Sequence, residues 1–261
     1  MSRKGIGGEI VRWSRDGFGE VAVADEDGIR SLYFGDILQS STRLDRPGEL
    51  VEDYSRAMVS ALIFGVDFRR ILLIGLGGGS LVHFLLGALP GCMVHVVELR
   101  QLVIDIARDL FHLPAENPNL EVFHAAGEDF VRQSAERETQ YDLIMVDAFD
   151  ENGPAAPLLG ADFLASCRAV LTEGGIFAIN LWCRPKDDFP GVYGSLRQAF
   201  GDNTLKLLPG EAYWNAIVLG TNSPELFADL PSYRPAARRL QREFGIDFPK
   251  YLKLLYWQNF R

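Results

Sequence analysis

The chain has 261 residues, of which 48% are hydrophobic and 23% are charged, and its formal net charge is −9. This length allows one full α/β core with a small appendage, and the composition is ordinary for a globular protein. The negative charge argues against a nucleic-acid-binding surface, which normally needs clustered Lys and Arg, and it is compatible with a cationic substrate.

The first predicted unit is a small antiparallel β domain over residues 1–46. Residues 20–24 and 29–34 alternate like strands and flank an Asp-Gly turn, so they are expected to form a hairpin. A few short strands cannot form a stable core alone, so this unit needs a partner surface. A helix is expected to open at Pro47-Gly48. Its apolar positions recur at fourfold spacing and comprise Leu50, Tyr54, Met58 and Leu62.

The remaining residues, 47–261, are predicted to form one catalytic domain of the α/β class. Apolar strand patterns alternate with helical ones, which predicts a parallel sheet with helices on both faces. The expected strands are 70–75, 93–98, 120–125, 141–147 and 174–181. Two later apolar runs, 205–208 and 216–219, flank Pro209-Gly210-Glu211 and are expected to close one edge as a hairpin. A sheet of this kind is characteristic of the Rossmann-like, methyltransferase-type fold.

A glycine turn follows the first of these strands. Gly75, Gly77 and Gly79 give the spacing G-x-G-x-G, whereas a dinucleotide fingerprint would need glycine at Ser80. This form suits a nucleoside without pyrophosphate, such as S-adenosylmethionine or a relative. The next strand ends at Glu98, where a carboxylate can accept hydrogen bonds from both ribose hydroxyls.

A pair of carboxylates follows the strand at 141–147. Asp147 ends this strand, Asp150 comes three residues later, and Gly153-Pro154-Ala155 continues as a loop. Both Asp residues can simply form hydrogen bonds within a loop, which Asp favours. Because Asp147 shares the sheet edge with the glycine turn and Glu98, a role in handling a cation or a proton is the preferred interpretation for it.

These motifs resemble the spermidine and spermine synthases, the polyamine aminopropyltransferases, over nearly the whole chain. The resemblance includes Gln39-Ser40, the glycine turn, Glu98, the segment 141–150 and the strand around residues 214–220. The Asp-x-x-Asp pattern followed by Gly-Pro-Ala is the most family-specific of them.

The resemblance implies an enzyme that moves the aminopropyl group of decarboxylated S-adenosylmethionine to a polyamine such as putrescine. No permanently bound cofactor is implied, and the chain would form a homodimer or homotetramer through its N-terminal unit. Asp147 would be the catalytic residue. The acceptor amine would be bound by Gln39, Tyr54 and Asp150, and the adenosyl group by Gly75, Gly77, Gly79, Glu98 and Glu128.

Three departures mark the chain as a divergent member of such a family. Gly78 stands where the family's turn carries the Asp that contacts the donor's amine, and Ala126 stands where an acid contacts adenine. Glu128 and Asp129 are possible substitutes for that acid. The family's Tyr-His-Glu pattern reads Tyr54-Ser55-Arg56-Ala57 here. Two alternatives therefore stay open: an S-adenosylmethionine-dependent methyltransferase, and a non-catalytic protein that binds a nucleoside or polyamine.

The other polar residue types point to no further chemistry. Cys92, Cys167 and Cys183 share no metal or redox spacing and are expected to be reduced, as in a cytoplasmic protein. The four histidines lack metal-ligand spacing, so no metal site is expected. No apolar stretch is long enough to span a bilayer, and residues 1–8 are too polar for a signal peptide, so no membrane partner is expected.

Overall fold

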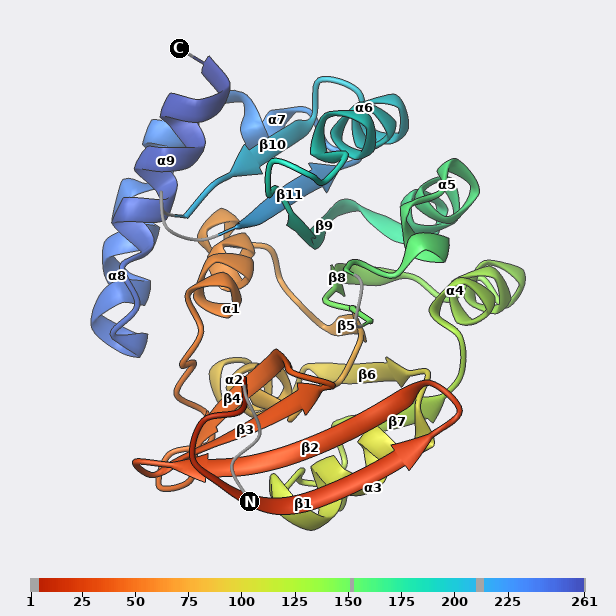
Figure 1. Ribbon diagram of the computed structural model, residues 1–261. Helices are drawn as coiled ribbons and strands as arrows, with labels where there is room; N and C mark the ends of the chain where they lie inside the picture. Colours follow the sequence, from red (N-terminus) through yellow and green to blue (C-terminus); the bar gives the residue numbers. More distant parts are fainter. Residues whose placement is uncertain (1–4, 151–152, 210–213, 261) are drawn as a thin grey trace.

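The computed structural model describes residues 5–150, 153–209 and 214–260, and they form a mixed α/β fold (Figure 1). The main sheet has seven strands in the order β10-β11-β9-β8-β5-β6-β7. They are β5 (Arg70–Ile74), β6 (Met93–Glu98), β7 (Leu120–His124), β8 (Tyr141–Val146), β9 (Leu171–Trp182), β10 (Thr204–Leu207) and β11 (Asn215–Thr221). Strands β5 to β9 pair in parallel, whereas β11 is antiparallel to both β9 and β10. The predicted Rossmann-like sheet with a hairpin at one edge is confirmed; Gly210 and Glu211 of the expected turn lie outside the described residues.

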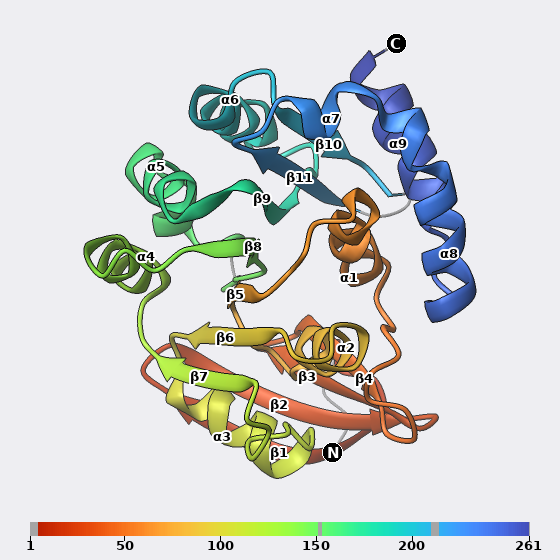
Figure 2. The ribbon, with the colours of Figure 1, turned by 180° about the vertical axis from the view of Figure 1, so that it is seen from behind.

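Helices cover both faces of this sheet (Figures 1 and 2). They are α1 (Asp53–Met58), α2 (Ser80–Ala88), α3 (Gln101–Leu110), α4 (Gly127–Glu136), α5 (Ala161–Ala169), α6 (Phe189–Phe200), α7 (Glu225–Ala228), α8 (Arg234–Phe244) and α9 (Phe248–Phe260). Short 3₁₀ segments span Val59–Phe64, Ala156–Leu159 and Leu230–Tyr233. Helices α4, α5 and α6 pack on one face, and α1, α2, α3, α8 and α9 contribute to the larger core on the other.

The N-terminal strands form a separate antiparallel sheet in the order β1-β2-β3-β4. They are β1 (Glu9–Asp16), β2 (Gly19–Glu26), β3 (Ile29–Phe34) and β4 (Ile37–Arg43). One face of this sheet contributes Val21, Val23, Leu32 and Phe34 to the larger core. The partner surface that the short strands need is therefore supplied by the same chain.

The first helix begins later than its apolar pattern predicts. Leu50 pairs with Thr42 in an isolated β-bridge, so the chain still runs extended there, and α1 begins only at Asp53. It continues as a 3₁₀ segment to Phe64. The predicted helix start at Pro47-Gly48 is wrong because residue 50 is engaged with β4, although Met58 and Leu62 are buried as expected.

The topology brings three chain segments to one edge of the sheet. Strand β5 lies between β6 and β8, and all three run in the same direction. Because the chain order reverses at β5, ligands of such sheets bind beyond these carboxyl ends. Within the described ranges, no helix is long and apolar enough to cross a membrane.

Candidate active site

The glycine turn lies directly against the end of β8. A Cβ on Gly75 would lie 2.1 Å from the carbonyl oxygen of Asp147, so only glycine fits where the two strand ends pass. Gly79 has φ 79° and forms the N-terminal cap of α2. The turn therefore serves two purposes, since it lets the backbone pass Asp147 closely and reverses the chain into α2.

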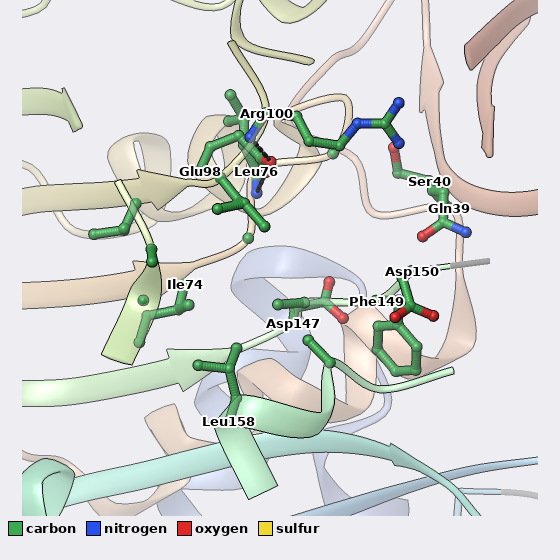
Figure 3. Close-up of a pocket in the computed structure, with 18 of the residues that line it drawn as sticks. Gln39, Ser40, Ile74, Leu76, Glu98, Arg100, Asp147, Phe149, Asp150 and Leu158 are labelled. Atoms are coloured by element: carbon green, nitrogen blue, oxygen red, sulfur yellow. Dashed lines mark hydrogen bonds between the residues drawn. The ribbon is translucent and has the colours of Figure 1, made fainter. Parts of the chain in front are cut away.

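Glu98 is held at this edge by backbone donors. The Leu76 amide donates to its Oε2 at 3.0 Å and the Arg100 amide to its Oε1 at 2.9 Å (Figure 3). The residue is 8% exposed, and this burial raises the pKa of Glu98 while the two amides and the Arg100 charge lower it. Each oxygen keeps acceptor capacity, so a diol in the cavity could donate to both.

The N-terminal sheet is anchored to this position through Arg100. The Arg100 guanidinium makes two hydrogen bonds to the Asp16 carboxylate, at 2.8 and 3.0 Å, and lies 4.3 Å from the ring centroid of Phe34. Arg100 is only 6% exposed, and its charge lowers the pKa of Asp16 against the effect of burial. The two sheets are therefore joined at the site by a partly buried ion pair.

Gly78 is enclosed on both sides. Its amide donates to the Ser40 hydroxyl at 2.7 Å, and a Cβ at this position would meet the Phe111 ring at 2.7 Å. An acidic side chain cannot occupy position 78 unless Phe111 moves. Where the family's turn carries an Asp, this chain therefore has Phe111 packed against Gly78, and no empty space remains beside the glycine.

A cavity of about 410 Å³ opens over these elements. Apart from Gly79, every predicted site residue contributes to its lining, namely Gln39, Tyr54, Gly75, Gly77, Glu98, Glu128, Asp147 and Asp150. Its apolar walls include Ile74, Val97, Leu158 and Phe149. Gly79 lies just outside, at the start of α2, because Ser80 and Leu81 take its place in the lining.

A second, smaller cavity of about 170 Å³ lies on the other side of Asp147. Its lining consists of Leu38, Gln39, Glu52, Tyr54, Asp147, Phe149, Asn180, Trp182 and Asn215. Gln39, Tyr54, Asp147 and Phe149 line both cavities and thus form the wall between them. Asp147 is the only carboxylate among these four.

Burial governs the protonation of Asp147. It raises the pKa of the Asp147 carboxyl to about 6, and hydrogen bonds from Asn180 and Tyr54 lower it in part. Asn180 donates to Oδ1 at 2.9 Å. A carboxyl group with a pKa near 6 is ionised at neutral pH yet can bind a proton readily, as a general base requires.

Tyr54 shares its hydroxyl between two acceptors. The hydroxyl donates to the Gln39 carbonyl at 2.9 Å and also contacts the Asp147 carboxyl. Burial raises the pKa of Tyr54 well above its usual value, and the negative charges of Asp147 and Glu52 add to this effect. Tyr54 is therefore a neutral hydrogen-bonding group between the two cavities.

Asp150 and Glu128 occupy the margins of the larger cavity. Asp150 is exposed and accepts a hydrogen bond from the Gly153 amide, which is the turn role that its sequence context allows. Glu128 lines the cavity next to Ala126, whereas Asp129 forms an ion pair with Arg132 outside it. Of the two acids beside Ala126, only Glu128 can reach a ligand there.

Sequence reasoning missed several polar residues of the site, among them Glu52, Arg100, Asn180 and Asn215. Arg56, which was expected to take the place of an acceptor-binding acid, points away from the site. It donates to the Leu50 carbonyl and pairs with Asp53. Glu52, two residues before Tyr54, brings a carboxylate to the smaller cavity instead.

Known proteins are similar to this chain in sequence and in fold. Residues 54–182 match the spermine/spermidine synthase domain. The polyamine aminopropyltransferase of Neisseria meningitidis serogroup A is 34% identical over 95% of this chain and 94% of its own length. A spermidine synthase in complex with the transition state analogue AdoDATO has a TM-score of 0.74 at 17% identity, covering 97% of this chain and 85% of its own.

A methyltransferase also shares the fold. Human methyltransferase-like protein 13 in complex with SAH has a TM-score of 0.66 at 24% identity, covering 75% of this chain and 93% of its own. The matches to the synthases extend over the N-terminal sheet as well, at 97% of the chain, and include relatives above 30% identity. The chain belongs to the spermine/spermidine synthase family.

Proposed function

We propose that this protein is a spermidine synthase-like aminopropyltransferase that uses decarboxylated S-adenosylmethionine and a diamine such as putrescine. The observation that carries this proposal is the position of Asp147 in the wall between two cavities of unequal size. A transfer between two substrates needs such an arrangement, because the group that prepares the nucleophile must face both of them.

The donor is assigned to the larger cavity. The Glu98 carboxylate, fixed by two amides, accepts hydrogen bonds from the ribose diol. The apolar walls formed by Ile74, Val97 and Leu158 suit the adenine ring, and Glu128 lies at the margin where the family's adenine-binding acid is missing. No permanently bound cofactor is needed for this chemistry, since the donor is consumed in each turnover.

The charges of the larger cavity favour the decarboxylated donor. Among the described residues, its lining has the carboxylates of Glu98, Glu128, Asp147 and Asp150 and one cation, Arg100, which is paired with Asp16. The Gly78 amide, which could otherwise bind a carboxylate, already donates to Ser40. An intact donor would therefore bring its own carboxylate among acids without a free cation in the described lining.

The amine acceptor is assigned to the smaller cavity. Glu52 and Asp147 provide two carboxylates for a molecule with an ammonium group at each end. The centroid of the Trp182 ring lies 5.3 Å from that of Phe149, and these two rings form an apolar wall of the cavity. The Arg184 guanidinium stacks on the Trp182 ring, 3.5 Å from its centroid. The methylene groups of a diamine would lie against Trp182 and Phe149.

The reaction follows from the placement of Asp147. Its carboxylate takes a proton from the near ammonium, which exposes a lone pair. The free amine attacks the carbon next to the sulfonium, a carbon–nitrogen bond forms, and the carbon–sulfur bond breaks with its electron pair going to sulfur. The products are a secondary ammonium and methylthioadenosine, and Asp147 then releases its proton to solvent.

Incubation of the purified protein with both donors tests the assignment. With decarboxylated S-adenosylmethionine and putrescine we expect equimolar methylthioadenosine and spermidine. Intact S-adenosylmethionine should give neither product nor methylated amine under the same conditions. Turnover with the intact donor alone would replace this proposal with the methyltransferase alternative.

The methyltransferase alternative has one specific observation in its favour. Gly78 carries no acid to hold the donor's ammonium, and packing against Phe111 prevents one. An acid at this position would repel an intact donor, so its absence removes one means of discrimination. Tight binding of methylthioadenosine without turnover of either donor would instead indicate a non-catalytic nucleoside-binding protein.

Self-association through the N-terminal sheet stays a prediction. The sheet buries one face against its own chain, and its outer strand β1 exposes Val11 and Trp13, by 43% and 37% respectively. A homodimer or homotetramer formed there would cover these side chains. Sedimentation of the full chain at micromolar concentration tests the idea, and a monomer would contradict it.

A further inference from the structure

Two side-chain amides connect Asp147 to the edge hairpin of the sheet. Asn180 lies on β9, is 3% exposed, and donates through Nδ2 to Oδ1 of Asp147 at 2.9 Å. Asn215, at the start of β11, donates through Nδ2 to Oδ1 of Asn180 at 3.0 Å. In the antiparallel register Asn180 faces Ile217, so Asn215 is its diagonal neighbour across the ladder.

The direction of these hydrogen bonds follows from the carboxylate. An ionised Asp147 can only accept, so Asn180 must turn its NH₂ group toward it. The carbonyl oxygen of Asn180 then faces away, where the NH₂ group of Asn215 meets it. If the Asn180 amide rotated by 180°, its oxygen would face the Asp147 carboxylate and its NH₂ group would face that of Asn215. Both hydrogen bonds would be lost, so Asn215 helps to fix the orientation of the Asn180 amide.

The other donor to Asp147 is not fixed in this way. The Tyr54 hydroxyl has one hydrogen and two acceptors, the Asp147 carboxyl and the Gln39 carbonyl at 2.9 Å. It can therefore donate to Asp147 when that residue is ionised and turn to Gln39 when Asp147 carries a proton. One hydrogen bond to Asp147 is permanent, and the other can change with its protonation.

We propose that Asn180, held by Asn215, is a positioning residue that reserves Oδ1 of Asp147 for a fixed hydrogen bond and leaves Oδ2 to take the proton of the acceptor ammonium. The proposal rests on the assignment of Asp147 as the general base. It specifies which oxygen handles the proton and why the carboxylate does not rotate away from the amine.

The electrostatic surroundings of Asp147 support this role. Burial raises the pKa of Asp147 to about 6, and the Asn180 hydrogen bond is the largest effect opposing it. Glu52 is the other charged side chain of the smaller cavity, and Glu98, Glu128, Asp150 and Arg100 are those of the larger one. Because the Arg100 charge is paired with Asp16, the Asp147 carboxylate is kept ionised mainly by hydrogen bonds from two neutral groups, Asn180 and Tyr54.

Titration of the Asp147 carboxyl tests the inference without any substrate. In protein labelled with ¹³C at the Asp carboxyl groups, the Asp147 signal is the one that Asp147→Asn removes. We expect Asn180→Leu to raise its midpoint by about one pH unit, because a donor to the charged form is lost. Asn215→Ala should raise it by less, since Asn180 remains but can rotate. Asn222→Leu, which alters an Asn bonded to Arg168 and distant from Asp147 in the structure, is the matched control and should leave the midpoint unchanged.

Kinetics give the second readout. The acid limb of the kcat profile should move to higher pH in Asn180→Leu, so that turnover falls about twofold at pH 7 and about tenfold near pH 5, and recovers in alkali. Asn180→Ser, which is too short to reach Asp147, should behave alike and replaces the Leu variant if that one fails to fold. An unchanged Asp147 midpoint in both variants would overturn the inference. If the wild type transfers no aminopropyl group, the proposed function fails while the titration still decides the role of Asn180.

Discussion

Glu98 and Asp147 are carboxylates at the ends of the two strands that flank β5, yet the fold holds them in different ways. Glu98 accepts from two backbone amides, Leu76 and Arg100, and lies beside a cation. Among the described residues, the donors to the Asp147 carboxyl are side chains, namely the amide of Asn180 and the hydroxyl of Tyr54. Backbone donors cannot rotate away, whereas side-chain donors can adjust to a change in charge.

Under the proposed function, this difference separates a carboxylate that binds the ribose from one that handles a proton. Glu98 has a fixed direction, which suits a ligand group that arrives and leaves without changing its charge. Asp147 has one fixed and one adjustable donor and a pKa near 6, which suits a group that gains and loses a proton in each cycle. Substitutions at the two sites should therefore affect different kinetic constants.

The largest effect is expected for Asp147→Asn. The amide keeps the size of the side chain but cannot accept a full proton, and general bases typically contribute about a hundred- to ten-thousandfold. Turnover of aminopropyl transfer should fall on this scale, while the affinity for methylthioadenosine changes little. Undiminished turnover would remove Asp147 from the mechanism.

The opposite pattern is expected for Glu98→Ala. Loss of a charged hydrogen-bond acceptor costs about 1.5–3 kcal/mol, which corresponds to roughly ten- to a hundredfold in affinity. Calorimetry with methylthioadenosine measures this effect directly. Affinity equal to that of the wild type would show that the ribose does not lie on Glu98.

A smaller effect is expected for Glu52→Gln, because this side chain is partly exposed to solvent. The KM for putrescine should rise by roughly three- to tenfold, since a partly screened ion pair contributes about 1 kcal/mol. Glu49→Gln serves as the matched control, because Glu49 forms an ion pair with Arg46 outside both cavities. Equal KM values in the two variants would contradict the assignment of Glu52 to the acceptor.

The last effect concerns stability rather than activity. The pKa of Asp147 in the folded protein, about 6, exceeds its usual value of 3.8, so the folded state is penalised when this carboxyl is ionised. The penalty is present above pH 6 and disappears as the pH falls toward 4. A shift of about 2 pKa units corresponds to about 3 kcal/mol, and a domain of this size gains about 2–4 °C for each kcal/mol. At pH 7 Asp147→Asn should therefore raise Tm by roughly 6–12 °C, and at pH 4 the two Tm values should coincide. A lower Tm at pH 7 would show that the buried charge is not a cost to the fold.

Local sequence patterns predicted the half of the site that depends on backbone geometry. The glycine turn, Glu98 and Asp147 follow apolar strand runs, so their positions at one sheet edge could be derived from strand order. Gly78 could be identified as a departure, but Phe111, which fills the space beside it, follows a distant helix and carries no local signal. Tertiary packing decided this position.

The lining of the smaller cavity could not be predicted in this way, because it depends on contacts between segments that are distant in the sequence. Asn180 and Asn215 come from two strands whose pairing register is set by the whole sheet, and a single Asn in a strand has no motif. The direction of Arg56 depends on where α1 begins, and that start is fixed by the pairing of Leu50 with Thr42. Sequence spacing could not predict which side of the short helix faces the cavity.

The ion pair between Asp16 and Arg100 limits how the molecule can be rearranged by engineering. Arg100 donates through its backbone to Glu98 and through its side chain to the N-terminal sheet, and Ser40 of that sheet accepts from the Gly78 amide. A chimera that exchanged the first 46 residues for those of a relative would have to keep Asp16 and Ser40 matched to Arg100 and Gly78. The N-terminal sheet contributes to the lining of the larger cavity, so it cannot be replaced as an independent module.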